Sequence, residues 1–408
     1  MKRHCRFCHA PLRTSFVDLN SSPLANSLLD EKSYDGVEMR YPLHAFVCEQ
    51  CFLVQLDAVV SADHIFADNY LYFSSYSDSW LAHCRAYCLD MMRRFGLTCD
   101  SRVVEIASND GGLLKNFVEA GIPVLGVEPA ANVAEVANRN GVPTKAIFFG
   151  RDTATALKAD GFAADLIAAN NVLAHVPDIN DFVEGFRILL KPQGAATFEF
   201  PHLLKLIQDV EFDTIYHEHF SYISLLAAER IMAAHGLVVF DVEEIPTHGG
   251  SLRLFVSHQG TREPGERVFA LRAKEREAAL DRIETYAAFA DEVVRVKCEV
   301  LGFLIEAKRQ GKRVVGYGAP AKGNTLLNYC GVGPELMPFT VDRSPHKQGR
   351  YLPGTRIPIR APETIFAERP DYVFVLPWNI SDEIVSQMAA VRDFGARFVT
   401  AIPRLKVW

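Results

Sequence analysis

The chain has 408 residues, which is too long for one hydrophobic core and predicts two or three domains, with three favoured. Its 49% hydrophobic and 23% charged residues are typical of a globular protein and exclude the disordered and fibrous classes. A net charge of −7 argues against a nucleic-acid-binding protein. The sequence shows no apolar run of the roughly 18 residues that a membrane span needs and no secretory signal. We therefore expect a cytoplasmic protein with reduced thiols and without a membrane or nucleic-acid partner.

Two Cys-x-x-Cys pairs near the start of the chain can present four thiolates to one ion; they are Cys5 with Cys8 and Cys48 with Cys51. Zn²⁺ favours four soft ligands in tetrahedral geometry, and four cysteines leave no open position for catalysis. The pattern therefore predicts a structural zinc ion, with a redox dithiol or an iron–sulfur cluster as alternatives. Zinc ribbons also occur in nucleic-acid-binding proteins, but the acidic net charge disfavours that function here.

Between about residues 80 and 255, predicted strands and helices alternate, which indicates a parallel sheet with helices on its faces. A strand over 102–107 is followed by a glycine turn and by a helix from 113 to 118, a unit that cradles cofactors. The next strand, 123–127, ends in Glu128 and Pro129. An acid at that strand end can accept both hydroxyls of a ribose.

The residues of the first turn distinguish between two cofactors. Glu105, Ala107, Asn109 and Gly111 stand where a dinucleotide site has G-x-G-x-x-G. The glycine at which a pyrophosphate approaches the backbone is missing, whereas Glu105 and Asn109 suit a cationic sulfonium ligand with an amino acid tail. The pattern therefore favours S-adenosylmethionine over NAD.

A further buried strand is predicted from 165 to 176, and its carboxyl end carries Asn170, Asn171 and His175. Ligands bind at the carboxyl ends of strands in open sheets, so the two asparagines are further candidates for cofactor binding. The alternative is that they cap the following turn and that His175 is a core histidine.

The segment 212–222 places six polar or ionisable side chains within seven residues, between apolar anchors. Beside a cofactor such side chains have shifted pKa values and can act as acids or bases, whereas on a solvated surface they need no function. His217 and His219 are two residues apart, so the motif H-E-x-x-H is absent and a second metal is a weak alternative. Further on, His248 precedes Gly249 and Gly250, a pair at which the backbone can approach a ligand closely.

Residues 264–310 predict one or two amphipathic helices, for which a solvated connector is the favoured interpretation. The segment 312–327 then repeats the order strand, glycine turn, helix, and its turn carries a lysine, an asparagine and a threonine. Together with the basic residues of 341–350, this turn favours an anion such as a phosphate. An NAD site is the alternative, although the sequence offers no acid at a convincing second strand end.

The chain resembles, nearly from end to end, the sugar C-methyltransferases that act on nucleotide-linked 4-keto-deoxysugars. The resemblance lies in the paired cysteines and in V-V-E-I-A-S-N-D-G, G-V-E-P-A, N-N-V-L-A-H-V, Y-H-E-H-F-S-Y, H-G-G-S-L-R, G-Y-G-A-P-A-K-G-N-T-L-L-N and V-D-R-S-P-H-K-Q-G-R-Y-L-P-G-T. It implies an α/β fold in three parts. These are a small zinc-binding domain over 1–62, a class I methyltransferase domain with a Rossmann-like sheet over 63–263, and a helical connector with a C-terminal Rossmann-like domain over 264–408.

The resemblance also implies methyl transfer from S-adenosylmethionine to C3, the carbon beside the C4 ketone, of a nucleotide-diphosphate sugar. His219 would be the base, with Glu218 orienting it or taking the proton itself. Tyr216 and His175 would contact the enolate or ketone oxygen. Tyr76 would reach the substrate from an aromatic segment over 69–76, for which interdomain packing is the alternative. Substrate binding would involve Tyr222, His248, Gly250, Tyr317, Lys322, Asn324, Arg343 and Lys347.

One residue departs from the family pattern. His202 follows Pro201 where a bulkier aromatic or an aliphatic residue is expected, which leaves the detail of the sugar pocket open. Methyl transfer to a sugar oxygen or nitrogen and an NAD-dependent oxidation are the competing functions. We expect one complete site per chain, in a monomer or a weak homodimer.

Overall fold

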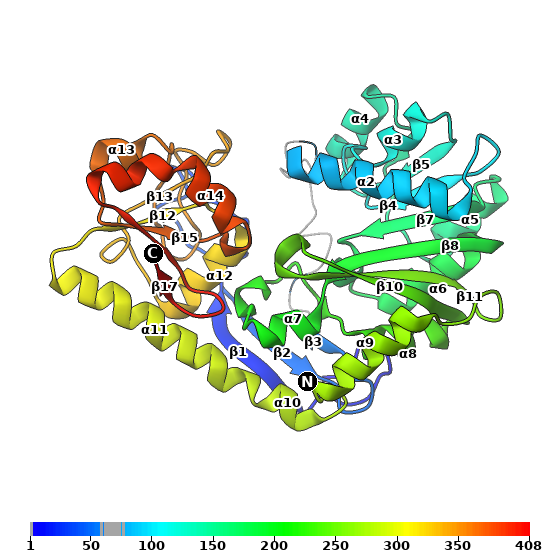
Figure 1. The fold of residues 1–408 in the computed structure, drawn as a ribbon, viewed down its shortest axis with the longest axis horizontal. Coiled ribbons are helices and arrows are strands. Elements are labelled where there is room, and N and C mark those ends of the chain that lie inside the picture. Colours follow the sequence, from blue (N-terminus) through cyan, green and yellow to red (C-terminus); the bar gives the residue numbers. More distant parts are fainter. Residues whose placement is uncertain (1–2, 58–59, 61–74, 76–77) are drawn as a thin grey trace.

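The computed structural model describes residues 3–57, 60, 75 and 78–408, and these residues form three β-sheets (Figure 1). The smallest sheet is antiparallel and has the order β1-β2-β3-β9. Its strands are β1 (Thr14–Ser22), β2 (Tyr41–Val47), β3 (Val54–Leu56) and β9 (Ser221–Tyr222). The fourth strand thus comes from the middle of the chain, so the N-terminal sheet is completed by the segment that carries His219.

The middle sheet has the order β10-β11-β8-β7-β4-β5-β6. The strands from β8 to β6 pair in parallel, whereas β11 pairs antiparallel with both β8 and β10. Its strands are β4 (Val103–Ile106), β5 (Val124–Val127), β6 (Thr144–Lys145), β7 (Ala164–Asn170), β8 (Leu190–Pro201), β10 (Leu237–Ile245) and β11 (Ser251–His258). The helices beside it are α2 (Asp78–Phe95), α3 (Leu114–Glu119), α4 (Ala131–Arg139), α5 (Arg151–Ala159), α6 (Ile179–Leu189), α7 (Leu203–Gln208) and α8 (Leu225–Ala234). In the order β6-β5-β4-β7-β8 the strands after β4 are added first on one side of it and then, from β7, on the other, so the strand order reverses between β4 and β7, where open sheets bind ligands.

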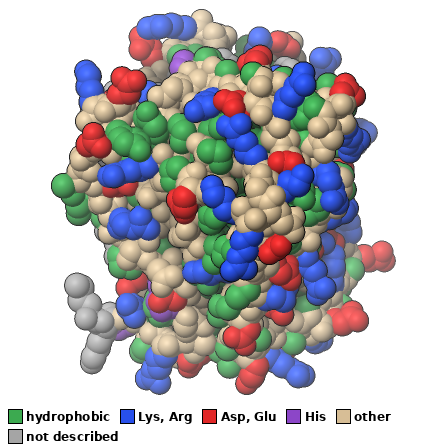
Figure 2. Space-filling view, turned by 90° about the vertical axis from the view of Figure 1, so that its left-hand side faces the viewer, with side chains coloured by type: hydrophobic (Ala, Val, Ile, Leu, Met, Phe, Trp, Pro, Cys, Tyr) green, Lys and Arg blue, Asp and Glu red, His purple; other side chains and the backbone are tan. Residues whose placement is uncertain are grey.

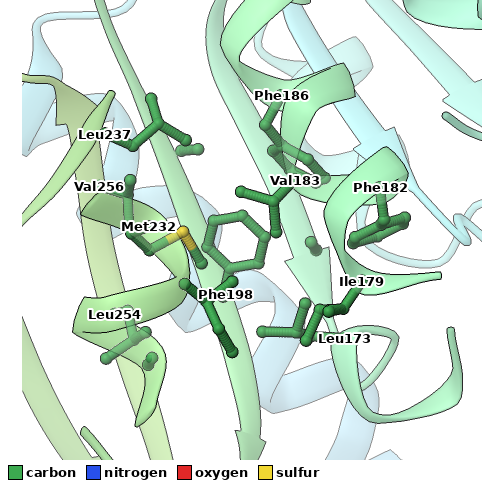
Figure 3. Close-up of a cluster of buried hydrophobic side chains, with 14 of the residues drawn as sticks. Leu173, Ile179, Phe182, Val183, Phe186, Phe198, Met232, Leu237, Leu254 and Val256 are labelled. Carbon is green, nitrogen blue, oxygen red and sulfur yellow. The ribbon is translucent and has the colours of Figure 1, made fainter. Parts of the chain in front are cut away.

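Apolar residues at helical spacing join α6 to this sheet. Figure 3 shows Val183 and Phe186 of α6 directed toward Phe198 of β8, with Met232 of α8 beside them; Phe182 of α6 packs against Phe186. All five side chains are at most 3% exposed. Burial of a large apolar side chain contributes roughly 1.5 to 3 kcal/mol, so this core fixes the strands whose ends carry the site.

The predicted strand over 165–176 is too long. β7 ends at Asn170 because Asn171 has a left-handed backbone with φ 54°, and a 3₁₀ turn, η2 (Leu173–His175), follows. A left-handed residue breaks the pleat of a strand, so the chain turns away from the sheet at Asn171.

The C-terminal sheet has the order β14-β13-β12-β15-β16-β17 and is parallel except for β17. Its strands are β12 (Val314–Tyr317), β13 (Thr340–Val341), β14 (Ile359–Arg360), β15 (Tyr372–Val375), β16 (Arg397–Thr400) and β17 (Lys406–Val407). The helical segments with it are α12 (Ala321–Cys330), α13 (Thr364–Glu368), α14 (Ser381–Gln387), η5 (Trp378–Ile380) and η6 (Ala389–Phe394).

The connector differs from the expected solvated helices. It forms α9 (Glu266–Glu277), α10 (Ile283–Ala287) and α11 (Phe289–Arg309). Helix α11 buries Val293, Val296, Val300 and Leu304, and these residues share one hydrophobic cluster with Phe16 of β1. Spacings of three and four residues place these side chains on one helix face, so α11 is a packing element that joins the N-terminal sheet to the C-terminal domain.

None of the described helices has the length and apolar character of a membrane span. On the face of the molecule that Figure 2 shows, Lys and Arg side chains are interspersed with Asp and Glu side chains.

Candidate active site

The four N-terminal cysteines lie together at the edge of the middle domain. Their ligand atoms are all within 4.8 Å of one another, with Sγ–Sγ distances of 3.5 Å for Cys5 and Cys51 and 3.4 Å for Cys8 and Cys48. Four thiolates around a tetrahedral zinc ion would have their sulfur atoms roughly 3.8 Å apart. Because the geometry and the soft ligand set both fit zinc, these residues would hold a structural ion. The neighbouring Arg6 donates to the carbonyl of Pro177 at 2.9 Å, which ties this knuckle to the middle domain.

Two carboxylates meet at the carboxyl ends of β4 and β5. Glu128 accepts hydrogen bonds through Oε2 from the Asn109 amide at 3.0 Å and through Oε1 from the Ala130 amide at 2.9 Å. Glu105 is 6% exposed, and its Oε2 is buried without a hydrogen-bond partner in the part of the chain that the structure describes. Burial, followed by the charges of Glu128 and Asp110, raises the pKa of Glu105 well above its usual value. A bound cation would relieve this cost.

The turn between these strands has a backbone shaped for a ligand. Ala107 and Asn109 have left-handed φ values of 56° and 50°, which are uncommon for non-glycine residues. Both polar side-chain atoms of Asn170, at the end of β7, are buried and make no hydrogen bond to any described residue. Gly111 has φ 84°, and a Cβ there would come within 2.9 Å of Val142. The predicted cofactor residues, with half-buried Pro129 and Asn171, thus gather at one edge. The buried atoms of Glu105 and Asn170 that have no partner among the described residues fit S-adenosylmethionine.

We expect Glu105→Gln to weaken the binding of S-adenosylmethionine and S-adenosylhomocysteine by roughly 10- to 100-fold. A hydrogen bond to a charged group contributes about 1.5 to 3 kcal/mol, and both ligands carry the amino acid tail. The measurement is titration calorimetry with these two ligands and with adenosine. Adenosine has no tail, so its affinity should stay unchanged in Glu105→Gln and fall in the matched variant Glu128→Gln. Equal loss of adenosine binding in both variants would contradict these separate roles.

His219 lies in a short irregular segment after η3 (Phe212–Thr214). Its Nδ1 is 2.8 Å from the Thr214 carbonyl oxygen, and its Nε2 makes no hydrogen bond with any residue that the structure describes. Because a carbonyl only accepts, Nδ1 carries the hydrogen and Nε2 keeps its lone pair when the ring is neutral. The ring of Tyr216 lies 4.0 Å from the ring of His219, and the ring of His175 lies 4.7 Å away.

The surroundings keep these histidines neutral. Burial lowers the pKa of His219 well below its usual value, and the charges of His175, His248 and Lys322 act in the same direction. Burial also lowers the pKa of His175 to about 4, and its Nδ1 is 2.8 Å from the Glu218 carbonyl. Because a carbonyl only accepts, Nδ1 of a neutral His175 carries the hydrogen. The expected contacts of His175 and Tyr216 with the enolate or ketone oxygen stay predictions.

The Glu218 carboxylate is directed elsewhere than expected. Asn26 donates to both of its oxygens, at 2.7 and 2.9 Å, while the Thr214 carbonyl orients His219. Burial raises the pKa of Glu218. Tyr222 is 5% exposed, and its ring is 6.2 Å from that of His219. The structure thus brings Tyr222 to His219, and it pairs Glu218 with the N-terminal domain.

Two acids that the sequence did not single out, Glu211 and Asp213, are buried beside this segment, and Asp213 joins it to the C-terminal domain. Asp213 accepts a hydrogen bond from Trp378 Nε1 at 2.8 Å, and Thr325 Oγ1 donates to the Ile215 carbonyl at 3.2 Å. Burial raises the pKa of Asp213 to about 6 and that of Glu211 to about 8, and the Lys322 charge opposes both shifts. Only their alternation with the apolar anchors Phe212 and Ile215 hinted at burial in the sequence.

The predicted substrate residues fall into two groups. The first group is Lys322 and His248, whose charges both lower the pKa of His219. Lys322 donates to Asn379 Oδ1 at 2.8 Å, and burial lowers the pKa of His248 to about 4. Gly250 follows His248 at the start of β11. The others lie around the C-terminal glycine turn. Tyr317 and Asn324 are buried, Lys347 Nζ is 2.9 Å from the Ala319 carbonyl, and Arg343 is exposed. Tyr76 lies outside the described residues.

His202, the departure from the family pattern, has a structural partner. Its Nε2 is 2.7 Å from Glu275 Oε1 of α9, and both side chains are buried. Glu275 also accepts hydrogen bonds from the Leu225 and Leu226 amides, at 2.6 and 2.9 Å. His202 therefore contacts the connector helix and the start of α8.

Three family models match successive parts of the chain: "Putative zinc binding domain" at residues 5–66, "Methyltransferase domain" at 80–242 and "C-methyltransferase C-terminal domain" at 246–403. The chain is 37% identical over 404 residues to the C-methyltransferase NovU of Streptomyces niveus, which covers 99% of this chain and 96% of that protein. The chain belongs to the C-methyltransferase family. The fold class and the two cofactors expected from the sequence, S-adenosylmethionine and zinc, are thereby confirmed.

Solved structures resemble about half of this C-methyltransferase. The 1,6-didemethyltoxoflavin-N1-methyltransferase of Burkholderia thailandensis is 18% identical, with 51% of this chain and 95% of that chain covered and a TM-score of 0.37. The magnesium protoporphyrin IX methyltransferase of Synechocystis PCC 6803 is 14% identical, with 48% and 89% covered and a TM-score of 0.34. The family assignment makes the chain an S-adenosylmethionine-dependent C-methyltransferase, which sets aside oxygen or nitrogen methylation and NAD-dependent oxidation.

Proposed function

We propose that this C-methyltransferase methylates C3 of a nucleotide-diphosphate 4-keto-6-deoxysugar. The observation that carries the proposal is the state of His219, a buried neutral imidazole whose Nδ1 faces the Thr214 carbonyl and whose Nε2 keeps a lone pair. Carbon becomes nucleophilic only when a base removes a proton and an adjacent carbonyl oxygen takes up the charge. A ketone beside the methylated carbon supplies that carbonyl.

In this mechanism Nε2 of His219 removes the proton from C3, and the electrons of the C–H bond move to the C4 oxygen. Tyr216, whose ring packs on His219, donates a hydrogen bond to that oxygen. When bound, S-adenosylmethionine supplies the methyl group that C3 attacks, and S-adenosylhomocysteine leaves. Lys322, within electrostatic reach of His219, contacts the nucleotide-sugar from the C-terminal domain.

The proposal is tested by incubating the enzyme with S-adenosylmethionine and 4-keto-6-deoxysugar nucleotides in deuterated water. We expect mass spectrometry to show the gain of one methyl group and, without the cofactor, solvent deuterium at C3. The matched control is the corresponding 4-hydroxy sugar nucleotide, which should show neither signal because it cannot form an enolate. If no 4-keto sugar nucleotide gains a methyl group or deuterium, this substrate class is wrong.

A further inference from the structure

The C-terminal glycine turn has an acidic partner that the sequence did not reveal. Residues 316–321 read G-x-G-x-x-A, follow β12 and lead into α12, as in nucleotide-binding sheets. We expected no acid at a convincing second strand end. The structure corrects this, because β13 pairs in parallel with β12 and Asp342 comes directly after it. The two-residue length of β13 hid this strand end in the sequence.

Asp342 repeats the hydrogen bonds of Glu128 in the cofactor domain. Its Oδ2 accepts from the amide of Ala319, in the turn after β12, at 2.8 Å, and its Oδ1 accepts from the Ser344 amide at 2.8 Å. Glu128 likewise receives the amide of Asn109, in the turn after β4, and the amide two residues further along its own chain. In both domains, therefore, a carboxylate at the second strand end is fixed by one amide of the first turn and one local amide.

A carboxylate fixed in this way keeps lone pairs on both oxygens, and these can accept the hydroxyls of a ribose. The Asp342 side chain is 16% exposed, and Lys347 Nζ lies 3.7 Å from its Oδ2. The Asp342 carboxylate and the Lys347 ammonium group therefore lie next to each other at the turn. A ribose beside a phosphate has this pattern of hydroxyl donors and negative charge.

The surroundings of Gly318 favour a mononucleotide over a dinucleotide. In a dinucleotide site the second glycine lets the pyrophosphate approach the backbone. Here a Cβ on Gly318 would lie 2.6 Å from Pro377 Cδ, so protein fills that space. From this turn α12 begins at Ala321, and its Thr325 donates to the Ile215 carbonyl at 3.2 Å, in the segment that carries His219. A nucleotide bound at Asp342 would therefore place its attached sugar on the side of the molecule that carries the catalytic base His219.

We propose that Asp342 binds the ribose hydroxyls of a nucleoside diphosphate, the nucleotide portion of the sugar substrate. The 3′-hydroxyl is the essential one, because ribonucleotides and deoxyribonucleotides share it. This inference rests on the proposed function for the identity of the ligand, but its test does not require methyl transfer.

The test is calorimetry on the full chain saturated with S-adenosylhomocysteine, so that the cofactor site is filled. The probes are uridine, guanosine and thymidine diphosphate, followed by the 3′-deoxy analogue of the tightest binder. We expect Asp342→Asn to weaken that binder at least about tenfold, and the 3′-deoxy analogue to bind the wild type and the variant equally weakly. Wild-type affinity in Asp342→Asn, or no binding of any probe to the wild type, would overturn the proposal.

The matched control is Asp371→Asn, because Asp371 also caps a backbone amide of this domain, that of Arg313, and pairs with Lys312. It precedes β15, whereas Asp342 follows β13, so its loss should leave nucleotide affinity unchanged. Unchanged affinity for S-adenosylhomocysteine shows that the Asp342→Asn variant is folded. If that variant does not fold, the same nucleotide titrations are made with Asp342→Glu. Probe binding through Asp342 without methylation of any 4-keto sugar would reject the proposed function and keep this inference.

Discussion

Replacing His219 with asparagine lowers kcat at least about 100-fold, which corresponds to roughly 3 kcal/mol of transition-state stabilisation. Asparagine is the sharper substitution because its amide nitrogen can replace Nδ1 as the donor to the Thr214 carbonyl while no basic Nε2 remains. The loss should appear equally in deuterium exchange at C3 and in methyl transfer, since both need the proton to be removed. Steady-state kinetics and exchange followed by mass spectrometry measure the two effects.

His217, two residues earlier in the same motif, is the control for this prediction. Its Nε2 is 3.2 Å from the Pro42 carbonyl and it lies against Tyr41 of the N-terminal sheet. His217→Asn should therefore lower stability more than kcat per folded enzyme. The lowered pKa of His219 also means that its base form persists below the usual histidine range, so kcat/KM should stay flat as the pH falls from 7 to 6. Turnover close to wild type in His219→Asn would remove His219 from its role.

Removal of zinc, by a chelator or by Cys48→Ser, should unfold the N-terminal sheet and abolish methyl transfer. Structural zinc ions contribute on the order of 10 kcal/mol in small zinc-binding domains, and the cysteine side chains at this site have few other partners. Activity should be lost with the fold because β9, which follows His219, pairs with β3 of that sheet. Thermal unfolding and metal analysis of wild type and variant measure both consequences.

Cys99→Ser and Cys298→Ser are the matched controls, because both side chains are exposed and lie outside the cluster of four. Neither should change the zinc content, the midpoint of unfolding or kcat. Full activity of a zinc-free protein, with an unchanged melting temperature, would show that the ion has no structural role.

Features carried by residues close in the sequence could be predicted. Each Cys-x-x-Cys pair is a short motif, and Asn109 of the turn after β4 is 19 residues from Glu128 after β5. The structure brings the two cysteine pairs together, and it brings the turn to the acid. The fold class followed from the alternation of strand and helix patterns, because each pattern reports its own local burial. The domain boundaries placed at residues 62 and 263 stay a prediction.

Features that depend on pairing between distant residues could not be predicted. Glu218 meets Asn26 across 192 residues, and Asp213 meets Trp378 across 165. The sequence around either acid does not indicate its partner, because these hydrogen bonds form only when the domains pack against each other. The burial of one face of α11 was missed for the same reason: the apolar residues that cover it belong to β1 and to the C-terminal domain.

The origin of β9 bears on how the protein forms during synthesis. The first three strands of the N-terminal sheet leave the ribosome early, but their fourth neighbour is Ser221–Tyr222. The cysteine cluster can therefore bind its ion long before β9 is synthesised. Until then, the backbone groups of β3 that later pair with β9 have no strand partner. Early metal capture would protect the nascent N-terminal segment from aggregation, so zinc starvation should reduce the yield of folded enzyme during translation as well as the stability of the finished chain.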